Sequence, residues 1–273
     1  MSASANVPEV ATRMLRSGDV TGLHTIVDSL AAIIEQYGTL YEWAAERPQP
    51  RAMRGRAPVF VAALPDQEET VVVRHAWHGG VLAPITGDLF RMPTRAPTEL
   101  ARSWMLRRME IPTTEVIGYA RYNAVLGFRR VDVVTRLIPD SYDLGMIAAG
   151  LAPQIDCDTA LLATKALLVK LAAHGVVHPD LNVKNILLRQ DRRGEVEALI
   201  IDVDVVQWDP TRAPLDTMRS NAARLLRSMR KWRINFGCDV AEARMAAFER
   251  EAIAATPPLA SMPGSDVHHL GKV

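Results

Sequence analysis

Three side chains in the stretch His174–Asp204 have the types and the spacing that phosphoryl transfer needs. Asp180 is followed closely by Asn185, and Asp202 ends an apolar run further along. A carboxylate can orient an attacking hydroxyl and accept its proton, while an amide oxygen and a second carboxylate can hold Mg²⁺. The alternative is structural, with Asp180 and Asn185 as turn formers and Asp202 as a strand-end cap.

Two short apolar runs predict how Asp202 returns to this loop. Ile186–Leu188 follows the asparagine at once, a polar turn lies around Arg192–Gly194, and Leu199–Ile201 leads directly into Asp202. Two apolar runs joined by a polar turn are typical of a β-hairpin. We therefore expect the hairpin to bring Asp202 beside the loop that carries Asp180, in one cleft.

The same residues match the catalytic-loop motif of protein kinases, His-x-Asp-Leu-x-x-x-Asn, which here runs from His178 to Asn185. The match predicts a two-lobed, protein-kinase-like α+β fold, with a small β-rich N-lobe and a mostly helical C-lobe. In such a fold Asp180 is the catalytic residue of the loop. We expect His178 to support the loop by hydrogen bonding rather than to act as a base.

The composition is that of a globular enzyme without a disulfide framework. The chain has 273 residues, of which 48% are hydrophobic and 23% charged, which is enough for two lobes. A net charge of +1 argues against a general nucleic-acid binder. Cys157 and Cys238 lack metal-ligand spacing, as in a reduced cytosolic protein. We find no secretory signal and no apolar run of about 20 residues, so we expect a cytoplasmic protein.

The pattern along the chain predicts four parts. Residues 1–50 are expected to form an N-terminal helical extension, because Val20–Ala45 carries apolar residues at helical spacing. Residues 51–138 form the predicted N-lobe and residues 139–255 the predicted C-lobe. Residues 256–273, rich in Pro, Ser, Gly and His, are expected to be a disordered tail.

Gly55 and Leu137 are the predicted N-lobe contacts for the nucleotide. Gly55 precedes the first β-rich run, where kinases place a glycine-rich loop over the phosphates. It is the one glycine left of that motif, and an ordinary turn glycine is the alternative; backbone N–H groups can cradle phosphates without three glycines. Leu137 lies in Arg136–Pro139, which fits the hinge between lobes. Strands are expected at Val59–Val61, Val71–Val73, Val116–Tyr122 and Arg130–Leu137.

Arg74 and Glu99 are the candidate ion pair of the N-lobe. Arg74 ends the run Val71–Val73, where protein kinases carry a lysine. Glu99 lies in the first turn of a predicted helix, Thr98–Met109. An arginine could bind a phosphate in a bidentate manner and pair with the glutamate. The alternatives are a solvated Arg74 and a Glu99 that only favours the helix N-terminus.

The predicted C-lobe contains three helices. Asp158–His174 has apolar residues at helical spacing and ends at Gly175, an expected C-cap. Arg219–Arg233 carries a basic face, and Ala241–Ala255 forms the third helix. The basic face is either simply solvated or attracts the phosphates of anionic lipid or glycan.

Several stretches together resemble the lipopolysaccharide kinase family, in particular the 3-deoxy-D-manno-octulosonic acid (Kdo) kinases. Val73–Gly80 resembles their Leu-Arg-His-Tyr-x-x-Gly-Gly element, and His178–Leu187 is similar to their catalytic loop. Ile201–Asp204 resembles their Ile-Asp-Phe-Asp, with Val203 in place of Phe. Asn221–Ser228 resembles their Asn-Leu-x-Arg-Leu-x-Arg-Ser. The resemblance covers roughly residues 51–235.

The resemblance implies an ATP- and Mg²⁺-dependent kinase that phosphorylates a Kdo hydroxyl of the lipopolysaccharide inner core. It also implies work on the cytosolic face of the inner membrane, with a glycolipid or sugar acceptor, and leaves open a peripheral contact with the membrane. The implied roles are these: catalytic base Asp180; a charge-neutralising cation near the transferred phosphoryl group, Lys184; metal ligands Asn185 and Asp202; phosphate-side pair Arg74 and Glu99.

Two other functions stay open at this point. A non-catalytic pseudokinase that binds a partner is favoured by the reduced glycine loop and by Arg74 in place of lysine. It is opposed by the presence of Asp180, Asn185 and Asp202, because a scaffold needs no metal ligands. A small-molecule phosphotransferase of the antibiotic-kinase type is the third reading.

Overall fold

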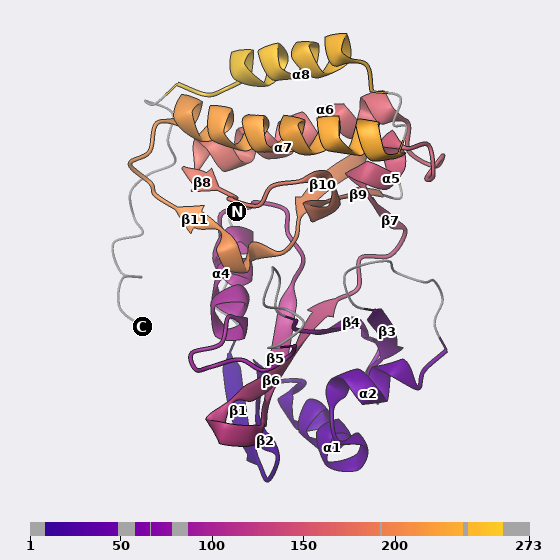
Figure 1. The fold of residues 1–273 in the computed structure, drawn as a ribbon, viewed down its shortest axis with the longest axis vertical. Helices are drawn as coiled ribbons and strands as arrows, with labels where there is room; N and C mark the ends of the chain where they lie inside the picture. Colours follow the sequence, from indigo (N-terminus) through magenta and orange to yellow (C-terminus); the bar gives the residue numbers. More distant parts are fainter. Residues whose placement is uncertain are drawn as a thin grey trace. The chain divides into compact units, whose positions relative to one another are not determined.

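The structure is a computed structural model that divides into two compact units. The first, here the β-rich unit, comprises Met1–Arg108 and Thr114–Ile138; the second, the helical unit, comprises Met109–Thr113 and Pro139–Val273 (Figure 1). A β-rich N-terminal part and a mostly helical C-terminal part are what the protein-kinase-like α+β prediction requires, and this prediction is confirmed. The structure describes residues 9–48, 58–65, 67–77, 87–191, 193–236 and 240–258.

One antiparallel sheet organises the β-rich unit. Its strand order is β1-β2-β5-β6-β4-β3, and each neighbouring pair runs antiparallel. Successive side chains of a strand point to opposite faces, so the buried Val71 and Val73 share one face and Arg74 lies on the other. The strands are β1 (Val10–Leu15), β2 (Gly18–Leu23), β3 (Val59–Ala63), β4 (Thr70–His75), β5 (Val116–Asn123) and β6 (Arg129–Arg136).

Helices cover both faces of this sheet. On one face, α1 (Val27–Tyr37) and α2 (Leu40–Ala45) bury Leu30, Ile33 and Trp43 in a core with Val71 and Val73. On the other face, α4 (Ala96–Arg108) packs Leu100 in a second cluster with Val131 and Val133 of β6. Because Arg74 is paired in register with Val133 and shares its face, its side chain is directed to the α4 side of the sheet.

The expected helical extension at residues 1–50 is wrong for its first part. Val10–Leu15 and Gly18–Leu23 are strands, and β2 is hydrogen-bonded to β5 within the sheet. Gly18 allows this pairing: its φ is 155°, and a Cβ there would lie 1.9 Å from the carbonyl oxygen of Arg121. The chain from β1 to α2 is therefore an integral part of the β-rich unit.

Three helices dominate the second unit, as the sequence pattern predicts. In Figure 1, α7 runs alongside α6 and α8 lies over them, and both α7 and α8 contact α6. Small sheets pair β10-β9-β7 and β11-β8. The elements are β7 (Ser141–Asp143), α5 (Leu144–Ala148), α6 (Cys157–Ala173), β8 (Val176–Val177), β9 (Ile186–Gln190), β10 (Val196–Ile200), β11 (Gln207–Trp208), α7 (Pro214–Phe236) and α8 (Glu242–Ala254), with single 3₁₀ turns η2 (Val183–Asn185) and η3 (Val203–Val205). A further 3₁₀ turn, η1 (Val125–Gly127), lies in the β-rich unit.

The predicted hairpin is present. β9 and β10 pair antiparallel, with Ile186 opposite Ile200, so the chain returns to the loop after one turn. Both strands bury apolar side chains against α6, which makes the register specific. Among the described helices, none is long and apolar enough to cross a lipid bilayer.

Candidate active site

Helix α7 holds the loop that carries Asp180. The buried Asn221 accepts a hydrogen bond from the His178 N–H (3.0 Å) and donates one to the Val176 carbonyl (2.9 Å). Arg224 Nε donates to the Pro179 carbonyl (3.0 Å), and Ser228 Oγ accepts from the Val183 N–H (3.1 Å). Asn221, Arg224 and Ser228 recur at helical spacing on one face of α7, and together they fix the loop backbone.

The loop also orients its own amide side chain. Asn185 Nδ2 donates to the backbone oxygen of Asp180 (2.8 Å), and Asn182 Nδ2 donates to the same oxygen (2.9 Å). Because the amide nitrogen is the donor, Oδ1 is the atom of Asn185 that can bind a cation. The bond also joins the two ends of the motif, so that the backbones of Asp180 and Asn185 are held together.

Two bonds connect the segment before Asp202 to this loop. The Ile201 N–H donates to the Asn185 carbonyl (3.0 Å), and His178 Nε2 lies 3.0 Å from the Ile201 carbonyl oxygen. A carbonyl only accepts, so Nε2 carries the proton. Burial lowers the pKa of His178 despite this bond and the nearby carboxylates, so the ring is a neutral support for the loop.

Asp202 has an uncommon backbone conformation. Its φ of 62° and ψ of 47° lie in the left-handed region, directly before the 3₁₀ turn Val203–Val205. Asp and Asn enter this region more easily than most residues, yet it still costs on the order of 1 kcal/mol for a residue with a Cβ. Such an outlier at the end of a strand is a reason to suspect function.

In the β-rich unit the structure brings Arg74 and Glu99 together. Arg74 Nη2 lies 2.6 Å from Glu99 Oε1, and the glutamate side chain is only 8% exposed. The alternation along β4 and the packing of α4 on the same face of the sheet explain the contact. The reading of Arg74 as a merely solvated strand-end residue is therefore wrong.

The two remaining candidate residues are Gly55 and Leu137, the predicted nucleotide contacts. Gly55 lies outside the described residues, as do Gly79 and Gly80. The Leu137 N–H donates to the Thr70 carbonyl (3.0 Å), which extends the β4–β6 pairing by one bond. A ligand could use this N–H only by replacing that bond.

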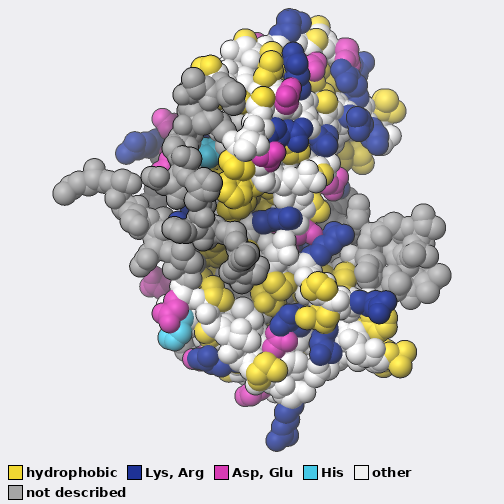
Figure 2. Space-filling view, turned by 90° about the vertical axis from the view of Figure 1, so that its left-hand side faces the viewer, with side chains coloured by type: hydrophobic (Ala, Val, Ile, Leu, Met, Phe, Trp, Pro, Cys, Tyr) yellow, Lys and Arg dark blue, Asp and Glu magenta, His cyan; other side chains and the backbone are white. Residues whose placement is uncertain are grey.

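The basic face of α7 has partners within the protein. Arg224 is bonded to the loop and to Ser220, as its place on the inner face requires. Arg230 pairs with Glu242 of α8 at 2.7 Å, and Arg233 lies 3.7 Å from the same residue. In Figure 2 Lys and Arg side chains are likewise interspersed with Asp and Glu on the face drawn. These contacts offset part of the positive charge expected to attract anions.

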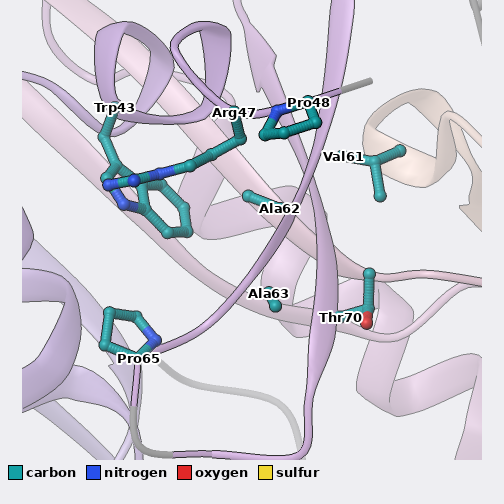
Figure 3. Close-up of a pocket in the computed structure, with 8 residues that line it drawn as sticks. All are labelled: Trp43, Arg47, Pro48, Val61, Ala62, Ala63, Pro65 and Thr70. Atoms are coloured by element: carbon teal, nitrogen blue, oxygen red, sulfur yellow. The ribbon is translucent and has the colours of Figure 1, made fainter. Parts of the chain in front are cut away.

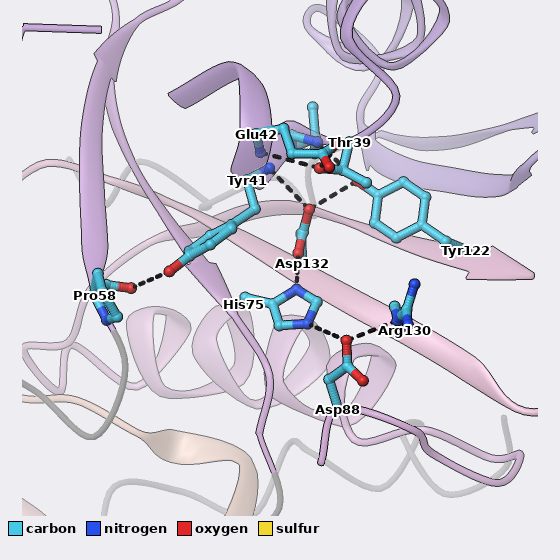
Figure 4. Close-up of polar contacts among 10 residues, drawn as sticks. Thr39, Tyr41, Glu42, Pro58, His75, Asp88, Tyr122, Arg130 and Asp132 are labelled. Atoms are coloured by element: carbon cyan, nitrogen blue, oxygen red, sulfur yellow. Dashed lines mark hydrogen bonds and ion pairs between the residues drawn. The ribbon is translucent and has the colours of Figure 1, made fainter. Parts of the chain in front are cut away.

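The structure contains a polar network around His75, the residue after Arg74, that no spacing in the sequence predicts. The fully buried Asp132 accepts hydrogen bonds from the Tyr41 N–H (2.9 Å) and the Tyr122 hydroxyl (2.9 Å), and lies 2.6 Å from His75 Nδ1 (Figure 4). His75 Nε2 lies 3.1 Å from Asp88, which also pairs with Arg130. Burial alone would lower the pKa of His75, but the bonds and charges of the two carboxylates outweigh it and raise the pKa.

The raised pKa of His75 predicts a pH-dependent stability. Protonated His75 is favoured in the folded protein, so its contribution is fully present below the ordinary pKa of 6.5 and is lost as the pH rises through the higher folded value. We expect the free energy of unfolding in urea to fall over this range, and the fall to be smaller in His75→Gln. Equal pH dependence in the two proteins would show that His75 does not carry the effect.

A cavity of about 620 Å³ lies in the β-rich unit, between α2 and the edge strand β3. Figure 3 shows the Arg47 guanidinium beside the Trp43 indole at its wall. None of the candidate site residues lines it. Its lining residues are Trp43, Arg47, Pro48, Val61, Ala62, Ala63, Pro65 and Thr70.

Comparison with known proteins identifies the family. A search of the curated proteins gave no match. Among solved structures, "WaaP in complex with acyl carrier protein" is a distant likeness, with a TM-score of 0.42 and 13% identity over 82% of this chain and 96% of that chain. The model of the lipopolysaccharide kinase (Kdo/WaaP) family matches residues 53–250, which is most of the chain. The chain therefore belongs to the lipopolysaccharide kinase (Kdo/WaaP) family.

Proposed function

We propose that this protein is an ATP-dependent kinase that phosphorylates a sugar hydroxyl, with Kdo of the lipopolysaccharide inner core as its acceptor. The observation that carries the proposal is the bonded connection from Asp180 through Asn185 to the segment that ends in Asp202. Family membership supports the lipopolysaccharide acceptor. Because that acceptor is a glycolipid, we further propose that the protein works at the cytosolic face of the inner membrane.

In this proposal Asp180 orients the acceptor hydroxyl and takes its proton. A base must be held still to act on a hydroxyl at hydrogen-bond distance. The backbone bonds from Asn182 and Asn185, and the support from α7 at Pro179 and Val183, supply that rigidity.

Asn185 and Asp202 are the proposed ligands for Mg²⁺. Amide and carboxylate oxygens suit this hard cation, which is commonly held by one or two carboxylates together with substrate phosphates. The described residues contain no group of three or more His, Cys, Asp or Glu that could hold a metal ion, so a protein-only zinc-type site is not supported there. When bound, Mg²⁺ would supply neutralisation of the nucleotide's phosphate charge.

The chain after Asp202 supports a small or glycolipid acceptor rather than a protein. It runs through the turn Val203–Val205 and the short strand Gln207–Trp208 into α7 at Pro214. Protein kinases use a long segment at this place, ending in Ala-Pro-Glu, near their peptide substrates. The short connection leaves few residues that could form a surface for a peptide substrate.

Arg74, held by Glu99, is the proposed contact for nucleotide phosphate. Glu99→Gln keeps the size and a hydrogen bond but removes the charge that fixes the guanidinium. A charge-assisted bond contributes about 1.5–3 kcal/mol, so we expect the KM for ATP to rise roughly tenfold. Steady-state kinetics at saturating acceptor measure it. Asp19→Asn is the matched control, since Asp19 is also a little-exposed carboxylate paired with an arginine, Arg121, at 2.7 Å. An unchanged KM for ATP would show that the Arg74–Glu99 pair does not help to bind the nucleotide.

The decisive test of the function is transfer of labelled phosphate from ATP to purified Kdo-lipid A with Mg²⁺ present. Incorporation into the sugar is the expected result. Transfer to an aminoglycoside instead would favour the antibiotic-kinase reading. If Mg²⁺ and ATP together fail to raise the melting temperature, the pseudokinase reading gains support, since a scaffold without metal ligands gives no such shift.

A further inference from the structure

An aromatic pair ends helix α7 beside the catalytic loop. The rings of Trp232 and Phe236 are 4.1 Å apart between centroids, at a tilt of 32°. Lys184, four residues after Asp180, places its Nζ 5.2 Å from the Trp232 ring centroid. Phe236 is 57% exposed, although an aromatic side chain of this size gains from burial.

The Trp232 ring is fixed rather than adaptable. Its Nε1–H donates to the Gly145 carbonyl of α5 (2.8 Å). A Cβ at Gly145 would lie 2.8 Å and 2.9 Å from two ring carbons, so only glycine allows this approach. Helix α5 is itself held at its start, where Asp143 Oδ1 accepts from the Met146 N–H (2.8 Å). The indole thus has one orientation, set by a different element from the helix that carries it.

One cation and one carboxylate lie near the aromatic pair. Lys184 stands over the indole as a cation and attracts Asp143 electrostatically. The carboxylate of Asp143 is occupied at the start of α5, where it accepts backbone N–H bonds. A ligand that approaches the pair therefore meets the exposed Phe236 ring, and the ammonium group of Lys184 lies over the neighbouring Trp232 ring.

We propose that Phe236, packed on Trp232, forms the face on which the acceptor sugar ring stacks, with Lys184 of the same cluster to meet an anionic group of that sugar. The inference rests on the proposed function and names the part of the site that recognises the acceptor. Aromatic faces carry negative charge density and attract the C–H groups of a ring that lies on them. Because Lys184 belongs to the same loop as Asp180, a sugar stacked here has its hydroxyls close to that loop.

Phe236→Ala is the main test, with the deacylated inner-core oligosaccharide as the probe because it has the sugars but no acyl chain. Loss of a stacking ring should raise the KM for this acceptor roughly fivefold to tenfold, by more than any change in the KM for ATP. Phe236→Tyr, which keeps the ring, should restore the wild-type KM. Ile234→Ala is the matched control, since Ile234 is 82% exposed on the same helix end and has no ring.

The outcomes distinguish a platform, meaning the aromatic face on which the sugar ring stacks, from a surface that binds lipid. If Ile234→Ala raises the KM as much as Phe236→Ala, or if the effect appears only with the acylated acceptor, the surface contacts lipid and the proposal is overturned. Calorimetric binding of the oligosaccharide keeps the test independent of catalysis. If the wild type binds it without phosphorylating it, the proposed reaction fails, and weaker binding by Phe236→Ala still supports the platform. Equal binding by the two proteins, or binding by neither, overturns the platform.

Discussion

Asp180→Asn is expected to lower kcat for phosphate transfer by about 10²–10⁴-fold, the usual contribution of a positioned general base. Asparagine has nearly the same shape but cannot accept the proton of the acceptor hydroxyl. The loop should keep its conformation, because the bonds from Asn182 and Asn185 go to the backbone oxygen of residue 180 and not to its side chain. The KM for ATP should change much less than kcat.

The measurement is steady-state kinetics with Kdo-lipid A, with the melting temperature recorded alongside. Asp191→Asn provides a matched control: the same change at an exposed residue just after β9, whose side chain accepts N–H bonds from Arg193 and Glu195 that asparagine can also accept. An Asp180→Asn protein that keeps kcat within a few-fold of the wild type would show that this carboxylate is not the base.

The hairpin that follows the loop with Asp180 could be predicted from sequence because the signals are local. Apolar runs on either side of Arg192–Gly194 specify a two-stranded pairing, and the pairing alone carries Asp202 back to the loop. Spacing alone does not decide whether Arg74 contacts Glu99, since the contact depends on which face of β4 meets α4. That choice follows from burial of Val71 and Val73 on the opposite side.

The first two strands could not be predicted in the same way. Val20, Leu23, Ile26 and Val27 suit a helical period, but only the last begins a helix. Val20 is instead fully buried in β2, whose partner β5 lies far along the chain. Pairing between strands so distant in sequence leaves no local pattern, and here it overrides the helical one.

The sequence does not identify the residues that support the site, for related reasons. The sequence indicates Asn221, Arg224 and Ser228 only through the family resemblance and, for Arg224, a basic helix face, although their spacing places them on one side of α7. The network around Asp132 depends on four separate segments that meet only in the folded sheet. No spacing rule could have joined His75 to Asp88 and Asp132 in advance.

Asp202→Asn is expected to remove Mg²⁺-dependent activity while the fold is kept. Loss of one of two proposed metal ligands should reduce kcat/KM by about 10²–10⁴-fold, since electrostatic stabilisation by a bound cation contributes several kcal/mol. Asparagine accepts the left-handed backbone conformation found at this residue, with φ at 62°, as readily as aspartate does. Its melting temperature should therefore stay close to that of the wild type.

Three substitutions at Asp202 separate the backbone from the ligand. Glycine also accommodates the left-handed conformation, whereas alanine pays about 1 kcal/mol or more for it. All three variants should lose activity, but only Asp202→Ala should also melt clearly lower. Melting curves with ATP alone and with ATP and Mg²⁺ test the ligand role directly, because the additional shift caused by Mg²⁺ should disappear in Asp202→Asn. A full Mg²⁺-dependent shift in that variant would place the cation elsewhere and leave the strained backbone at Asp202 without a catalytic reason.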